Sequence, residues 1–263
     1  MDEDAVAAKL DPERFPTRLS VVAQNPEDAQ QDVSSGDDDG QKDDDVIGVN
    51  GATFKVSELG PSQSTMNVAK AVGMAINHIL KGKAGGKLGA FISNDKRIMD
   101  GHHRWISSYM VDPNASIGGY AVNFPAKQLI PVLNAITVGK VGRLEGKPGK
   151  GSFADFNADT IAKQLQILYQ EGNKYGLTPE KAQEAIQKFS GVDGEAGIRA
   201  AAEKMEQNLS TATMSTPEGA PERLDMPVID KKDISSAIGL LQGGYIDVNP
   251  PYADQDVKKA AEE

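Results

Sequence analysis

Apolar residues cluster or alternate with polar ones in three short stretches of the first half of the chain, and these stretches predict strands. The first, residues 52–59, alternates apolar and polar positions and ends at Gly60-Pro61. The second, residues 88–93, turns and continues through residues 97–99. The third is residues 120–124.

Between the strands the apolar spacing changes to that of helices. Ser62 or Ser64 is the expected N-cap of the first helix. Its apolar members are Met66, Ala69, Val72, Ile76, Ile79 and Leu80. A second helix opens at Asp100-Gly101 and stops at Asp112-Pro113, because proline cannot continue the helical hydrogen bonding. Its predicted buried face holds Trp105, Ile106, Tyr109 and Met110.

The second half of the chain reads as helices alone. Residues 127–138 have helical spacing, and Pro131 among them predicts either a late start or a kink. Three further helices are expected, one from about Asp159, one from the N-cap and N1 pair Thr178-Pro179, and one over residues 195–209. Residues 210–227 are a linker rich in Ser, Thr and Pro, and Asp230 is the expected cap of a last helix through Leu241.

This order of elements predicts an α/β (α+β) fold with a helical C-terminal region. We expect an acidic N-terminal segment at 1–45, an α/β domain at 46–150, a helical region at 151–209, and a linker, one helix and a tail at 210–263. Residues 25–45 are mainly Asp, Gly, Gln and Ser, so they cannot bury enough apolar area to offset their ordering entropy. The N-terminal segment is therefore predicted to be largely disordered.

Two apparent ligand motifs fail on spacing. Asp37-x-Asp39-Gly40 begins like a calcium loop, but Val46 stands at the twelfth position, where a bidentate Glu is needed. The glycine- and lysine-rich stretch at 139–152 fits no P-loop register and follows no strand. Neither a calcium loop nor a P-loop is predicted.

Composition narrows the class of protein. The 263 residues are enough for one large domain or two small ones. No cysteine is present, which excludes disulfides, a thiolate nucleophile and a cysteine-ligated zinc site. No apolar run approaches the ~20 residues of a membrane span, and Met1-Asp2-Glu3-Asp4 is too acidic for a secretory signal. We expect an intracellular protein without membrane contact.

The net charge of −10 is unevenly distributed. Residues 46–150 contain thirteen Lys and Arg against five Asp and Glu, a net charge of +8, whereas residues 25–45 and 151–263 each carry −8. A basic segment within an acidic protein favours a phosphate-bearing partner for that segment. Loop lysines alone would give the same total, so an ordinary basic surface is the alternative.

The basic segment contains the run Asp100-Gly101-His102-His103-Arg104-Trp105, with two of the three histidines and the single tryptophan. Backbone N–H groups at a helix N-terminus attract an anion, and Gly101, which has no side chain, allows the anion to approach the backbone closely. Arg104 can offer a bidentate fork to phosphate. His102 and His103 can donate to phosphate or transfer protons, and Asp100 can hold Mg²⁺ or orient a histidine, so these three are the catalytic candidates.

The same run also has an ordinary structural interpretation. Asp100 would cap the helix, His102 and His103 would lie on the surface, and Arg104 would pair with a carboxylate. The residues alone leave both interpretations open. A two-histidine metal site is not supported, since adjacent histidines face different ways on a helix and His78 lies on another helix.

The chain resembles the ParB/sulfiredoxin superfamily, and especially the ParB-like nuclease domains of plasmid and phage proteins. The resemblance lies in the order of elements: a strand, Pro61-Ser62-Gln63, a helix, a strand, residues 98–105, a helix and a strand. The resemblance covers about residues 46–137 and implies a small mixed-sheet domain. The superfamily binds nucleotide phosphates at a Gly-x-x-Arg turn, which implies Gly101, His102, His103 and Arg104 as binding residues, with Gln63 beside them. It also implies a nucleoside triphosphate, CTP or ATP, with Mg²⁺.

The chain departs from the superfamily in specific places. Sulfiredoxins have a reactive cysteine in the place of His102, so their reaction is excluded here. Partition proteins usually have Glu-Arg-Arg after the glycine, and His-His-Arg is closer to the kinase-like and nuclease-like branches. Glu58 is the nearest upstream carboxylate for a kinase base. Residues 175–192 begin like the helix-turn-helix of partition proteins, but they lie in an acidic region that would repel DNA.

Three functions therefore compete. The leading hypothesis is binding of a nucleotide or phosphodiester at the Asp-Gly-His-His-Arg turn, with NTP hydrolysis, phosphoryl transfer or nuclease activity as open alternatives for chemistry. The second is a non-catalytic structural or assembly protein, phage virion-associated, in a homo-oligomer or larger assembly. The third is a DNA-binding, partition-like protein. We expect a cytoplasmic location, or the host cytoplasm or virion if a phage encodes the chain.

Overall fold

The computed structural model describes residues 45–141, 148–173 and 176–245. Three predictions lie outside these residues: the disordered N-terminal segment apart from Asp45, the rejected calcium loop apart from its last positions, and the tail after Tyr245. The stretch rejected as a P-loop is described only in part. Asp45 itself is buried, so the packed part of the chain includes the residue before the predicted start at Val46.

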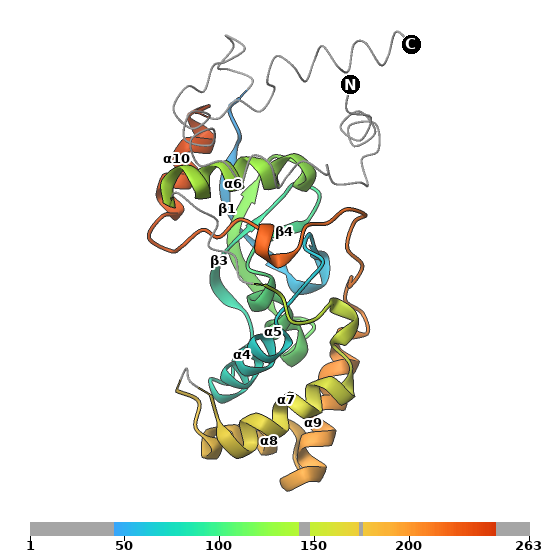
Figure 1. The fold of residues 1–263 in the computed structure, drawn as a ribbon. Coiled ribbons are helices and arrows are strands. Elements are labelled where there is room, and N and C mark those ends of the chain that lie inside the picture. Colours follow the sequence, from blue (N-terminus) through green and yellow to red (C-terminus); the bar gives the residue numbers. More distant parts are fainter. Residues whose placement is uncertain (1–44, 142–147, 174–175, 246–263) are drawn as a thin grey trace.

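Five strands form one sheet in the order β1-β5-β3-β4-β2. Their bounds are β1 (Val49–Lys55), β2 (Gly60–Pro61), β3 (Gly86–Ile92), β4 (Arg97–Asp100) and β5 (Ser116–Val122). The β1/β5 and β3/β4 pairs are antiparallel, whereas the β3/β5 and β2/β4 pairs are parallel. The expected α/β fold is confirmed, with a mixed sheet (Figure 1).

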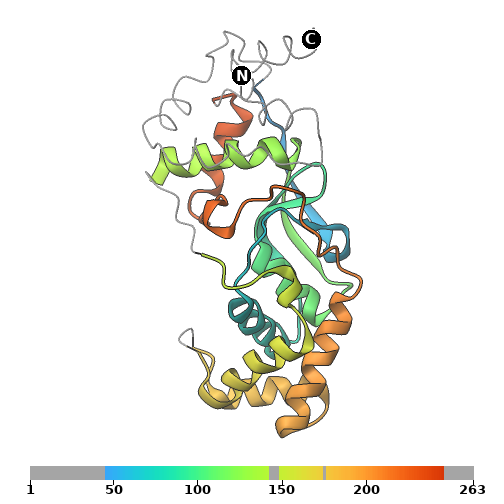
Figure 2. The same ribbon diagram turned by 45° about the vertical axis from the view of Figure 1, so that its right-hand side comes forward.

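The sheet separates two hydrophobic cores because successive side chains of a strand point to opposite faces. On β3, Ala90 and Ile92 belong to one core and Phe91 to the other. The first core is covered by α4 (Val68–Leu80) and α5 (His102–Val111), and the second by α6 (Ala126–Val141) and α10 (Ile234–Gln242). Figures 1 and 2 show these helices on opposite sides of the sheet.

Helix α4 begins later than predicted. Its N-cap is Asn67, whose side chain accepts a hydrogen bond from the Lys70 N–H at 3.0 Å. The predicted caps Ser62 and Ser64 are wrong, because the helix begins only at Val68. Ser62 is fully buried, and its hydroxyl donates to the Ile98 carbonyl of β4 instead.

Helix α5 follows β4 after the single residue Gly101. The four residues of its predicted apolar face are all fully buried, namely Trp105, Ile106, Tyr109 and Met110. The indole N–H of Trp105 donates to the Val56 carbonyl at 2.9 Å. This side-chain packing fixes the direction in which the first turn of α5 points.

On the second core, one of the two alternatives predicted for the helix at Pro131 is excluded, and the predicted cap of the last helix is wrong. Helix α6 starts at Ala126, well before Pro131, so the predicted late start does not occur. The Ala126 N–H donates to the carboxylate of Asp95, which ties the helix start to the β3–β4 turn. The N-cap of α10 is Asp233 and not Asp230, because the Asp230 carbonyl accepts the Asp233 N–H in a turn that precedes the helix.

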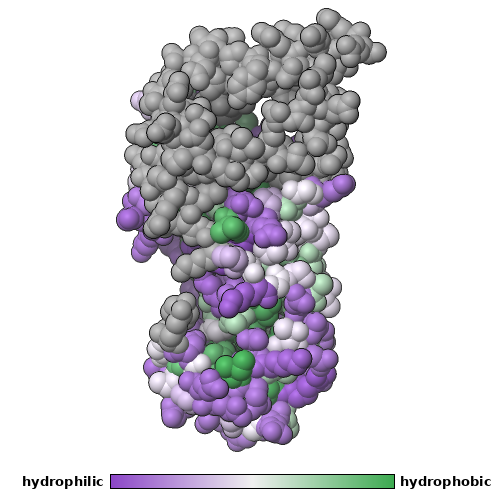
Figure 3. Space-filling model, in the orientation of Figure 1, coloured by the Kyte–Doolittle hydropathy of each residue, from purple (hydrophilic) through white to green (hydrophobic). Residues whose placement is uncertain are grey.

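Helices α7 (Ala158–Glu171), α8 (Pro179–Ser190) and α9 (Gly194–Leu209) enlarge the first core. Thr178 caps α8 and Pro179 occupies its first turn, as predicted. The end of α9 is joined to α5, since the Asn208 side chain donates to the Met110 carbonyl at 2.8 Å. On the side drawn in Figure 3 the surface of these helices is largely hydrophilic, with scattered apolar groups of the kind common on proteins.

Residues 221–233 form an extended segment that we call the strap. It includes one short turn of 3-10 helix, Arg223–Asp225, and it runs across the sheet region toward α10 (Figures 1 and 2). Its backbone is joined to the loop between β2 and α4, since the Ser64 N–H donates to the Pro221 carbonyl at 2.8 Å. The strap therefore brings residues 223–231 to the cavity at the start of α5.

No helix in the described ranges is long and apolar enough to cross a membrane.

Candidate functional site

The junction of β4 and α5 has the geometry of an anion-binding turn. Gly101 has φ 113° and ψ 10°, a left-handed conformation that favours glycine, and it is the N-cap of α5. A Cβ on Gly101 would lie 3.0 Å from the Cβ of Ala90 on the neighbouring strand. Both the backbone angle and the space therefore require glycine here. No side chain caps this end of the helix.

Arg104 and Asp100 form an ion pair across the first turn of α5. Nη2 of Arg104 lies 3.0 Å from Oδ2 of Asp100, and Nη1 donates to the Leu88 carbonyl. The two side chains are partly exposed, at 31% for Arg104 and 20% for Asp100. Burial raises the pKa of Asp100, and the Arg104 guanidinium opposes the rise. The fork of Arg104 is therefore held in place beside the turn.

The two histidines hold the loop between β2 and α4. Nε2 of His102 accepts a hydrogen bond from the Ser62 N–H at 3.1 Å, and Nε2 of His103 accepts one from the Asn67 N–H at 3.2 Å. An acceptor nitrogen carries no proton, so each neutral ring carries its proton on Nδ1. Adjacent residues on α5 thus fix two points of the same loop.

Burial keeps both imidazoles neutral. His102 is 3% exposed, and desolvation, assisted by the Arg104 charge, lowers its pKa to about 3. Desolvation also lowers the pKa of His103 to about 2, and the nearby charges of Lys70, Arg223 and Arg104 add to this effect. A ring with so low a pKa does not accept a proton near neutral pH.

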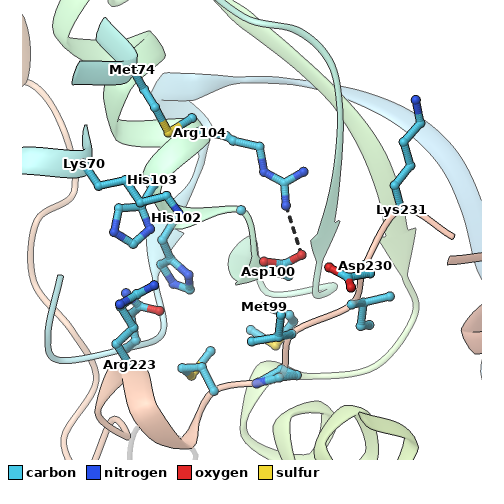
Figure 4. Close-up of a pocket in the computed structure, with 16 residues that line it drawn as sticks. Lys70, Met74, Met99, Asp100, His102, His103, Arg104, Arg223, Asp230 and Lys231 are labelled. Carbon is cyan, nitrogen blue, oxygen red and sulfur yellow. Dashed lines mark hydrogen bonds and ion pairs between the residues drawn. The ribbon is translucent and has the colours of Figure 1, made fainter. Parts of the chain in front are cut away.

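A cavity of about 420 Å³ opens at the N-terminus of α5. It is lined by the β4–α5 turn, by Gln63 of the β2–α4 loop, by Lys70 and Met74 of α4, and by the strap. Figure 4 shows Lys70, His103 and Arg223 on one side, Asp230 and Lys231 on the other, and Asp100 with Arg104 between them. The cavity is thus built from four separate parts of the chain.

Positive charge converges on this cavity. Four cationic side chains line it, those of Lys70, Arg104, Arg223 and Lys231. The two anionic ones are Asp100 and Asp230. Since His102 and His103 are neutral, the lining carries a net charge of +2. Three of these cations, Lys70, Arg223 and Arg104, lower the pKa of His103 through their charges.

The same cavity has an apolar wall. Met226, Pro227, Val228 and Ile229 of the strap line it together with Met99 and Met74. Met226 and Ile229 are buried in the second core, and Val228 is half-buried. A ligand in this cavity therefore meets cations and backbone amides on one side and apolar side chains on another.

The described residues contain no cluster of three or more His, Cys, Asp and Glu side chains that would hold a metal ion by itself. Asp100 and Asp230 are the two carboxylates of the lining. One or two carboxylates together with substrate phosphates are the usual environment of Mg²⁺. Any Mg²⁺ site here would thus need oxygens from a phosphorylated ligand.

All the predicted site residues lie together on this cavity: Gln63, Asp100, Gly101, His102, His103 and Arg104. Gln63 is buried, and its side-chain amide donates to the Thr65 carbonyl at 2.7 Å. Glu58, named as the nearest upstream carboxylate, is exposed and does not line the cavity. His78 lies elsewhere on α4, where Nδ1 contacts the Lys83 carbonyl.

Sequence reasoning missed Lys70, Arg223, Lys231 and the apolar wall. Lys70 lies on the polar side of a helix whose neighbours the sequence does not reveal. Arg223 and Lys231 lie in or beside the predicted linker. The apolar run 226–229 in an otherwise polar segment was a signal that this part of the chain packs against something.

Comparison of the chain with protein-family models, with curated proteins and with solved structures finds no match.

Proposed function

We propose that this protein binds a phosphate group of a nucleotide, or of a phosphodiester, in the cavity at the N-terminus of α5. The observation that carries the proposal is that Lys70, Arg104 and Arg223 line one cavity together with the first turn of α5, whose N-cap is Gly101. Backbone N–H groups of a first helical turn, together with the helix dipole, attract an anion.

The electrostatics of the cavity support an anionic ligand. A net charge of +2 in a partly enclosed space favours an anion more than the same charge on an open surface, because water screens it less. Arg104 supplies a planar fork suited to phosphate, and its partner Asp100 holds the fork next to the turn. The neutral histidines add no charge.

The shape of the cavity supports a ligand of nucleotide size. A volume of about 420 Å³ lies within the range of pockets for small organic ligands, and its apolar wall offers a contact for a flat ring. We therefore propose a nucleoside phosphate, with CTP or ATP as the first ligands to test. The resemblance to the ParB/sulfiredoxin superfamily leads to the same ligands.

Chemistry on the bound phosphate is a further part of the proposal. Mg²⁺, when bound with the phosphate, would neutralise its charge, and Asp100 and Asp230 are the residues that would hold it. His102 and His103 remain predicted proton carriers, but their low pKa values speak against that role. We assign them to positioning the β2–α4 loop.

Isothermal titration calorimetry with CTP, ATP, GTP and UTP, with and without Mg²⁺, tests the proposal. Lys70→Ala and Arg104→Ala should each weaken binding about tenfold, which corresponds to ~1.4 kcal/mol. Lys55→Ala is the matched control, since Lys55 is exposed on β1 away from the cavity, and it should leave the affinity within twofold. Absence of binding by the wild type, or equal affinities for all the variants, would exclude the proposed function.

A further inference from the structure

The strap, although most of it lies in the predicted linker, supplies many of the residues that line the cavity. Six of the sixteen lining residues are consecutive strap residues, 226–231, and Arg223 is a seventh from the same segment. The turn of Gly101 and the strap line the same cavity, and Figure 4 shows Arg223 and Asp230 of the strap on either side of His102 and Asp100. A ligand held at the turn is therefore enclosed by the strap.

The two ends of the strap are fixed. At its start, the Arg223 N–H donates to the Thr65 hydroxyl at 2.9 Å, and the Asp225 carbonyl accepts from the Asn134 side chain at 2.7 Å. At its end, the Asp233 N–H closes a turn with Asp230, and α10 follows. The loop that receives the start of the strap is the one that the two histidines position.

The middle of the strap is held differently. Within the part of the chain that the structure describes, no backbone group from Met226 to Lys232 bonds to another segment. Met226, Pro227 and Ile229 hold it through burial alone. Residues 226–232 can therefore move away from the cavity without breaking a backbone hydrogen bond to another segment, although such a movement exposes these three side chains. Loops that close over a ligand are a common part of binding sites.

The strap carries positively charged side chains near the turn of Gly101. In Figure 4 the Arg223 guanidinium points toward His103, next to the backbone of the first turn of α5. Nη1 of Arg223 also donates to the Pro148 carbonyl at 3.3 Å. Lys231 lies at the other end of the span. The strap thus brings a cation to each side of the turn.

We propose that Arg223 is a phosphate-binding residue of this site, and that residues 226–232 are a lid that opens to admit the ligand and closes over it. This rests on the proposed function, because it concerns the same cavity. It adds that the ligand is enclosed between the turn of Gly101 and the strap. A long nucleic-acid strand does not fit under the closed lid, so the proposal favours a free nucleotide over an internal phosphodiester.

The absence of native cysteine allows a direct test of the lid. In full-length protein, Val228→Cys places one thiol on the lid, and Thr53→Cys places one on the exposed surface of β1 as a control. The rate of maleimide labelling is measured with and without saturating tripolyphosphate or ATP. We expect the ligand to slow labelling at position 228 at least fivefold and to leave the rate at position 53 unchanged.

Arg223→Gln provides the second arm, with Lys55→Gln as its control. Arg223→Gln should weaken calorimetric binding of tripolyphosphate about tenfold, and Lys55→Gln should not. Fluorescence of Trp105, the single and fully buried tryptophan, verifies that both variants are folded. If Lys70→Ala weakens binding while Arg223→Gln and the labelling rate at 228 do not respond, the strap proposal is overturned and the phosphate site stands. If the wild type binds neither probe, both proposals are overturned.

Discussion

Nε2 of His102 accepts a hydrogen bond at 3.1 Å from the backbone N–H of Ser62, which precedes it by forty residues. Both groups are buried, so neither has water as an alternative partner. The contact joins the first turn of α5 to the loop that carries Gln63, and both of these parts line the cavity. Histidine is often a catalytic residue, but His102 here accepts a hydrogen bond that holds the backbone of the β2–α4 loop.

Replacing His102 should therefore lower the free energy of unfolding, and the loss should be larger when the new side chain cannot accept the hydrogen bond from the Ser62 N–H. His102→Leu removes the acceptor and leaves the Ser62 N–H unsatisfied, at a cost of about 2–3 kcal/mol in the free energy of unfolding. His102→Gln keeps an oxygen that can reach the same position, and it should lose about 1 kcal/mol or less. Urea denaturation followed by Trp105 fluorescence measures both values. Equal losses for the two variants would mean that the hydrogen bond contributes nothing.

Acid should destabilise the fold through the two histidines. Their folded pKa values, about 3 for His102 and about 2 for His103, lie below the ordinary 6.5, so protons bind the unfolded chain more strongly. The stabilisation from the neutral rings is complete above pH 6.5 and is lost as the pH falls toward 3, at up to ~1.4 kcal/mol per pH unit for each ring.

This pH dependence can be separated from that of the carboxylates. Unfolding free energies at pH 7.5, 6.5, 5.5 and 4.5 are compared between the wild type and the double variant His102→Gln, His103→Gln. The variant should show a flatter profile between pH 6.5 and 4.5. Parallel profiles would show that the histidines do not titrate on unfolding.

Gly101→Ala should destabilise the protein more than a substitution at another left-handed glycine. Gly191 ends α8 with φ 78°, and a Cβ there meets no atom within 4 Å. Gly191→Ala therefore adds only backbone strain, about 1 kcal/mol. Gly101→Ala adds the contact with Ala90 as well and should cost at least ~2 kcal/mol. Thermal unfolding of both variants measures the two losses of stability, and their difference is the contribution of the steric contact with Ala90.

Asp100→Asn should strengthen binding of an anion that carries no metal. The substitution removes a negative charge from the cavity and releases Nη2 of Arg104 from its ion pair. Tripolyphosphate in the absence of Mg²⁺ should then bind about fivefold more tightly, a gain of ~1 kcal/mol. Calorimetry at low and moderate salt measures the change. Weaker binding would instead indicate that Asp100 is needed to hold Arg104 in its binding geometry.

The local parts of the fold were predictable from the sequence. Helical spacing identified the face of α5 that holds Trp105 and Tyr109, and both are fully buried. Thr178-Pro179 marked the start of α8, because capping depends on neighbouring residues alone. The start of α4 was misplaced because Ser62 is engaged by His102 and Ile98, and these contacts depend on tertiary structure.

The sequence predicted the residues of the turn between β4 and α5, but not the residues of the strap that line the same cavity. Asp100, Gly101 and Arg104 are close in sequence, so one run of residues identified them. Arg223 follows Arg104 by about 120 residues and lies in a segment without helical or strand spacing. No periodicity connects the strap to α5. Arg223 is brought to the site by tertiary contacts, namely the packing of Met226 and Ile229 into the second core and the hydrogen bond from the Arg223 N–H to the Thr65 hydroxyl.

The late position of the strap in the chain has a consequence for biosynthesis. During translation the sheet and α5 leave the ribosome well before residues 221–233 are made, so the cavity lacks one wall until the strap has been synthesised. A product that terminates soon after α9 would keep much of the first core and the turn of Gly101, yet it would expose the second core and leave the turn open to solvent. Under the proposed function, ligand binding would therefore distinguish molecules that contain the strap from such prematurely terminated ones.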